Sequence, residues 1–217
     1  MAIKEIELKV PTSYGDISLQ RWLTLQNDLK NYEDDDNAVT AIMFLHLCGL
    51  EPNYLKSIAV DDYALIKSEL ESFISNTDLP LQRIITIDGK EYGFEPNLSQ
   101  MSYGAYADIT SHKQLTIDEN WAKIMDILYR PIVRKKGEMY SIEPYRGEIN
   151  PDKWLEVGMD VHFGALFFFV NLLMDLLKGI LNYTMEMEFP HNIKSILERS
   201  GQLIPLSLNS PAEILRK

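Results

Sequence analysis

The chain has 217 residues, of which 46% are hydrophobic and 24% are charged. This composition is typical of a globular protein with enough apolar side chains to form a core, and it excludes disorder over the whole length. The formal net charge of −11 repels nucleic acid phosphates and anionic lipids, so binding to either would need a strong local basic patch. Protein partners are therefore the first expectation.

The first elements expected along the chain are a strand and a helix. Residues 6–10 alternate aliphatic and charged side chains and stop at Pro11, which is typical of a strand. A helix is expected from Ser18, whose hydroxyl can cap the helix N-terminus. Ile17 and Trp22 occupy the two positions of a hydrophobic staple around this cap.

Two more helices are expected before residue 80. The acidic run 33–36 precedes apolar residues at helical spacing in 39–50, so its carboxylates would lie where a helix dipole favours negative charge. A second helix opens at Asp61 and Asp62 and closes near Asn76. Its expected buried face comprises Tyr63, Ile66, Leu70, Phe73 and Ile74.

The clearest β signal is in residues 84–94, where Asp88-Gly89 separates two alternating apolar runs and predicts a tight hairpin. A capping box of Thr116 and Glu119 predicts an amphipathic helix that ends before Pro131. A further short strand is expected over residues 139–142.

The C-terminal region predicts a long helix that begins after residue 150, with possible breaks at Gly158 and Gly164, and runs to about residue 187. Its apolar run 161–177, with three phenylalanines at 167–169, is interrupted by charged and polar residues, which argues against a membrane span. We interpret it as a central core helix with a narrow polar stripe, and no membrane is expected as a partner.

Together these patterns predict a mainly α protein with a small β part (α+β), whose helices pack around the long C-terminal helix. Residues 1–202 are expected to form a single helical domain with a small sheet, including a final helix over 190–200. Residues 203–217 are expected to be a tail, either frayed or docked on a partner.

The sequence contains no local signature of a catalytic, metal or cofactor site, so neither an enzyme nor a cofactor is expected. The single cysteine, Cys48, lies in an apolar helical run and is interpreted as a small buried residue. The alternative from another class is a small enzyme with a dispersed site that uses residues such as His46, Asp160 and His162. His46 and Cys48, two positions apart on a helix, point in different directions and cannot by themselves bind one atom.

The only basic concentration lies at residues 130–136, with tyrosines nearby. One interpretation is a solvated hairpin with Lys135-Lys136-Gly137 at its tip, and another is a surface that binds single-stranded nucleic acid, for which the net charge is unfavourable. A third is docking to a protein surface, with tyrosine and arginine as interface anchors. The candidate partner-binding residues are Tyr129, Arg130, Arg134, Lys135, Lys136 and Tyr145.

Several short segments, taken in order, resemble a group of small proteins encoded among the virion genes of tailed phages, including crAss-like phages. The segments lie at 9–13, 16–20, 92–98, 128–132, 142–145 and 164–172, and they read KVPTS, DISLQ, YGFEPNL, LYRPI, IEPY and GALFFFVNL. The resemblance spans most of the chain, and it is carried by the order of the segments.

The resemblance implies a non-enzymatic protein that acts by protein-protein contacts, either as a minor structural or cargo component of the virion or as a tail assembly factor resembling a chaperone. The implied partners are other phage structural proteins, together with self-association. The implied location is the host cytoplasm during assembly, and the virion if the protein is retained there.

Overall fold

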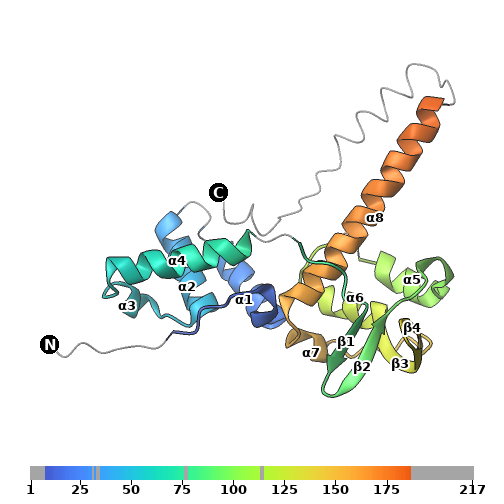
Figure 1. The fold of residues 1–217 in the computed structure, drawn as a ribbon, viewed down its shortest axis with the longest axis horizontal. Helices are drawn as coiled ribbons and strands as arrows, with labels where there is room; N and C mark the ends of the chain where they lie inside the picture. Colours follow the sequence, from blue (N-terminus) through green and yellow to red (C-terminus); the bar gives the residue numbers. More distant parts are fainter. Residues whose placement is uncertain (1–7, 31, 33–34, 76–77, 113–114, 187–217) are drawn as a thin grey trace.

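The computed structural model describes residues 8–30, 32, 35–75, 78–112 and 115–186. In Figure 1, helices α1 to α4 lie on one side of the start of α8 (Met159–Glu186), and a sheet with α5 and α6 lies on the other. Among the described residues, buried side chains from both sides form one hydrophobic core. The expected α+β class, with a long C-terminal helix, is confirmed.

The N-terminal side consists of helices joined by short loops. Their bounds are η1 Tyr14–Asp16, α1 Leu19–Leu29, α2 Asp36–Cys48, α3 Pro52–Leu55 and α4 Val60–Ile74. Ser18 caps α1 as expected, because its side chain accepts a hydrogen bond from the Arg21 amide, and Ile17 and Trp22 are buried beside it.

Helix α2 is capped by the carboxylate of Asp35, which accepts hydrogen bonds from the Asn37 and Ala38 amides. The expected role of the acidic run is therefore confirmed at Asp35 and Asp36, while residues 33–34 lie outside the described part. In α4, four of the five residues expected on the buried face are buried, and Tyr63 is partly buried against the core.

The sheet has four antiparallel strands in the order β1-β2-β3-β4. The strand bounds are β1 Ile84–Ile87, β2 Lys90–Phe94, β3 Tyr129–Lys136 and β4 Met139–Ile142. The hairpin at 84–94 and the strand at 139–142 are thus confirmed. Asp88 and Gly89 both have positive φ, 50° and 76°, as a tight two-residue hairpin turn requires.

Three expectations about local structure are wrong. The helix expected from Thr116 begins instead as α6, Trp121–Leu128, because Ile117 is buried and the residues around Asp118 form turns. Residues 8–10 of the expected first strand have no regular structure, and the rest of that strand lies outside the described residues. Of the two possible breaks in the long C-terminal region, the one at Gly158 is confirmed, because residues 156–158 interrupt the helix, but the one at Gly164 is wrong, because α8 continues through it.

Four short elements were not expected from the sequence. They are η1, α3, η2 Leu98–Gln100 and α5 Tyr103–Thr110, whereas α7 Asp152–Leu155 lies in the helical region expected after residue 150. The expected helix over 190–200 and the domain boundary at residue 202 lie outside the described residues.

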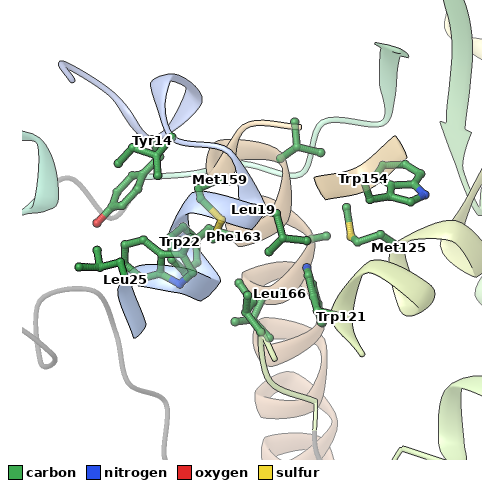
Figure 2. Close-up of a cluster of buried hydrophobic side chains, with 14 of the residues drawn as sticks. Tyr14, Leu19, Trp22, Leu25, Trp121, Met125, Trp154, Met159, Phe163 and Leu166 are labelled. Atoms are coloured by element: carbon green, nitrogen blue, oxygen red, sulfur yellow. The ribbon is translucent and has the colours of Figure 1, made fainter. Parts of the chain in front are cut away.

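Only the first part of α8 is a core helix. Residues 159 and 161–166 are buried, and Phe163 and Leu166 pack with side chains from α1, α6 and α7 in the cluster that Figure 2 shows. The phenylalanines at 167–169 are partly buried against this core. Beyond them α8 projects away from the other labelled elements (Figure 1), and five of its large apolar side chains are exposed. The interpretation of the whole rod as a central core helix is therefore wrong for its second half.

Two glycines in α8 give a test of this arrangement. A Cβ atom at Gly164 would lie 2.5 Å from the backbone oxygen of Pro80, whereas a Cβ atom at Gly179 would have no neighbour within 4 Å. Gly164→Ala should therefore lower the free energy of unfolding by about 1–3 kcal/mol. Gly179→Ala should raise it by up to about 1 kcal/mol, because alanine favours the helix. Urea unfolding followed by circular dichroism measures both, and equal effects would contradict the close approach.

Candidate interaction surfaces

The basic hairpin β3-β4 divides into a buried base and an exposed tip. Tyr129 is 0% exposed and its hydroxyl donates a hydrogen bond to the Gln82 carbonyl at 2.7 Å. Burial raises the pKa of the Tyr129 hydroxyl well above its usual value, so it stays protonated. The Tyr129 ring is therefore part of the core, and its expected role as a partner anchor stays a prediction.

Arg130 also belongs to the base of the hairpin. Its guanidinium pairs with the carboxylate of Glu95, and the two side chains are only 11% and 9% exposed. Buried ion pairs of this kind hold two segments together, because either charge left alone would be strongly destabilising. Arg130 thus fixes β3 to the segment after β2 and is not an accessible anchor.

The tip of the hairpin carries the remaining candidates. Arg134, Lys135 and Lys136 are exposed, and Lys135 pairs with Glu91 at 2.6 Å. The turn at Gly137, with φ of 59°, confirms the expected hairpin tip. These cations form a small solvated basic surface, and their role in partner binding stays a prediction.

Tyr145 lies apart from this tip and is half-buried. Its hydroxyl donates a hydrogen bond to the carboxylate of Asp108 on α5. Burial first, and then this hydrogen bond, raises the pKa of Tyr145 to about 12. Its hydroxyl therefore has a partner within the chain and holds the loop after β4 against α5.

The residues named for a dispersed catalytic site have separate partners. His46 on α2 lies 2.7 Å from the carboxylate of Asp28 on α1, and Asp160 accepts a hydrogen bond from the Gln82 amide at 2.6 Å. His162 is completely buried and contacts neither of these carboxylates. Cys48 is buried as expected, and burial raises the pKa of its thiol to about 11, which disfavours the nucleophilic thiolate.

His162 is the centre of a buried polar network at the start of α8. Its Nδ1 atom accepts a hydrogen bond from the Trp121 indole at 3.2 Å, and its Nε2 atom lies 3.2 Å from the Trp154 carbonyl. A carbonyl can only accept, so Nε2 carries the proton and the ring is neutral. Burial lowers the pKa of His162 to about 4. This is a satisfied core histidine.

A shallow groove of about 600 Å³ lies between β1 and the α7-α8 connection. Its ionisable lining residues are Asp88, Lys153 and Glu156, and the ammonium group of Lys153 is already paired with Asp126. The described residues contain no group of three or more His, Cys, Asp or Glu side chains that could hold a metal ion. The groove therefore offers no assembled acid-base or metal chemistry.

An exposed apolar surface lies on a helix that the sequence analysis assigned to the core. We call residues 171–182 the distal segment of α8. Five large apolar side chains there are between 39% and 60% exposed, namely Leu172, Leu173, Met174, Leu176 and Ile180. A contiguous apolar surface of this kind marks a site of interaction in a folded protein. The sequence signal was present as a broad apolar face, but the same pattern is expected for a buried helix.

Helix α8 has the length and composition of a membrane span over Met159–Asn182. An 18-residue apolar stretch of it has a mean hydropathy of 1.8, and 17% of that stretch is buried in the protein. Two observations weigh against that use. The first turns are already buried in the protein core. Asp175 and Lys178 would then lie in the hydrocarbon and cost about 2.5–3.5 kcal/mol each, against a gain of about 0.3–0.6 kcal/mol for each Leu, Ile, Phe or Val. The expectation of no membrane partner stays a prediction.

Comparisons of the chain with protein-family models, with curated proteins and with solved structures found no match. The functional assignment therefore depends on the surfaces described above and on the segments quoted from the sequence.

The two ion pairs of the hairpin test the division into base and tip. Glu95→Gln leaves the Arg130 guanidinium buried without a counter-charge, and should lower the free energy of unfolding by about 3 kcal/mol or more. Glu91→Gln, the same change next to the exposed Lys135, should lower it by less than about 1 kcal/mol. Urea titrations of both variants measure the difference. Similar losses would mean that Arg130 is not structural.

The neutral state of His162 predicts a pH dependence of stability. Between pH 6.5 and about pH 4 the unfolded chain binds this proton and the folded chain does not, so stability falls as the pH is lowered. In His162→Gln the amide can still accept and donate, but it does not titrate. The wild type should therefore lose up to about 1.4 kcal/mol per pH unit relative to this variant below pH 6. Parallel pH profiles in urea unfolding would show that His162 is not responsible.

Proposed function

We propose that this protein acts by protein-protein contact in a tailed phage, as a minor virion component or as a tail assembly factor. The observation that carries the proposal is the distal segment of α8, which projects from the folded body (Figure 1) and in which five large apolar side chains are 39–60% exposed. The segments that resemble phage virion-gene proteins support the choice of a phage context.

The charge distribution favours a protein partner. The chain as a whole carries a net charge of −11, whereas Asp175 and Lys178 leave the distal segment with no net charge. A neutral apolar helix on an acidic body is suited to packing against other helices, while the body stays soluble through its charge. The implied partners are other phage structural proteins or further copies of the chain, in the host cytoplasm during assembly.

The two rival functions have less support. A nucleic-acid accessory role would need cations interleaved with accessible aromatic rings, yet Tyr129 is buried and Tyr140 donates its hydroxyl to the Phe94 carbonyl. An enzymatic role would need His46, Asp160 and His162 to act together, yet each has a separate partner in the fold.

Leu176→Asp tests the proposal, because Leu176 is 60% exposed at the middle of the distal segment. In a phage that encodes this chain, quantitative mass spectrometry should find the wild-type protein in purified particles or in tail assembly intermediates. The variant should be depleted from these fractions by about tenfold or more, since a charge at the centre of a contact removes the gain from burying leucine.

Leu65→Asp is the matched control, because Leu65 is 61% exposed on α4. The same substitution is thus made at a similarly exposed leucine away from α8. It should leave the amount of protein in particles and intermediates unchanged. Absence of the wild-type protein from both fractions, or equal depletion of the two variants, would contradict the proposed function.

A further inference from the structure

The distal segment of α8 has a polarity pattern that reads the same in both directions. Counted outward from the midpoint between Leu176 and Leu177, residues at equal distances match in character. The matched pairs are Asp175 with Lys178, Leu173 with Ile180, Leu172 with Leu181, and Asn171 with Asn182. Only Met174, opposite Gly179, departs from the pattern.

On a helix this pattern gives an apolar face and an opposite, charged face. With about 100° between successive residues, Leu173 and Ile180 lie at the centre of the apolar face, and Leu176 and Leu177 flank them. The charged residues Asp175 and Lys178 lie on the opposite side of the helix, where they form an exposed ion pair at 3.6 Å. The centre of the apolar face therefore coincides with the centre of the reversed pattern.

In a two-fold symmetric antiparallel contact each residue meets the residue at the same distance on the other side of the axis. A pattern that reads the same in both directions therefore brings apolar residues against apolar residues along the whole contact. We propose that the occupant of this face is a second copy of the chain, whose α8 packs antiparallel to the first with the two-fold axis near Leu176 and Leu177. Leu173 of one copy then packs opposite Ile180 of the other. This inference rests on the proposed function and names the partner of the same surface.

Electrostatic repulsion selects the antiparallel direction. Each chain carries a net charge of −11, all of it outside the distal segment, whose Asp175 and Lys178 cancel. Parallel pairing would place two acidic bodies side by side, whereas antiparallel pairing places them at opposite ends of the paired helices. The antiparallel arrangement also opposes the two helix dipoles favourably. Binding of a different protein to this face would not require a pattern that reads the same in both directions, and it would not require that pattern to be centred on the apolar face.

The first experiment measures the oligomeric state of the full chain by sedimentation velocity over a range of micromolar concentrations. The wild type should be a dimer. Leu173→Asp should raise the dimer dissociation constant by at least about thirtyfold, as expected for a residue at the centre of an interface. Leu65→Asp, with a comparably exposed leucine on α4, should remain a dimer.

The second experiment tests direction by disulfide formation in a Cys48→Ala background. Leu177→Cys lies next to the two-fold axis and should form a covalent dimer on mild oxidation. Leu173→Cys alone should not, because the two copies of residue 173 would be about 10 Å apart along the helices. A mixture of Leu173→Cys and Ile180→Cys chains of different mass should form the mixed dimer. Disulfide formation by Leu173→Cys alone would indicate parallel pairing and overturn the proposal.

Other occupants of the face give distinct results. A monomeric full chain that dimerises only after truncation at residue 186 would show that the chain's own C-terminal residues cover it, and flotation with neutral lipid vesicles would show a membrane. Either result overturns the dimer. If the chain is monomeric but Leu176→Asp is still lost from particles or tail intermediates, the dimer fails while the proposed function stands.

Discussion

The direction of α8 depends on one buried hydrogen-bonded network. His162 accepts from the Trp121 indole and donates to the Trp154 carbonyl, and the Trp154 indole in turn donates to Asp126 at 3.0 Å. These groups come from α6, α7 and α8, so the network fixes the first turns of the long helix to its two neighbours. Buried polar groups are costly unless all are satisfied, which makes this arrangement specific as well as stable. The distal segment therefore projects from a rigid base.

The sheet is attached by the same principle. Tyr129 and Arg130 at the base of β3 are partnered by Gln82 and Glu95, so the hairpin is held where it leaves the body, while its outer part is exposed. Both projecting elements, the hairpin and α8, thus combine a buried, hydrogen-bonded base with an accessible end. The two ends differ in chemistry, since one is basic and the other is apolar, and the body between them is acidic.

The sequence was sufficient where a local interaction determines the structure. Asp88-Gly89 defines its turn through backbone conformation alone, and Ser18 caps its helix through a contact three residues away. It was insufficient where burial depends on distant segments. The cations beside Tyr129 suggested a surface cluster, but the ring is buried by residues far along the chain. The apolar face of α8 is compatible with a core or with an exposed contact, and only the arrangement of the other helices distinguishes them.

The width of the apolar face connects the proposed dimer with the proposed function. Leu172 and Met174 lie about 90–110° to either side of the face centre, beyond the reach of one neighbouring helix. An antiparallel pair would bury the centre of the face and leave these flanks open on both sides. Each flank would then be repeated by the two-fold axis. The polar stripe, with Asp175 and Lys178, would still face water and limit further association.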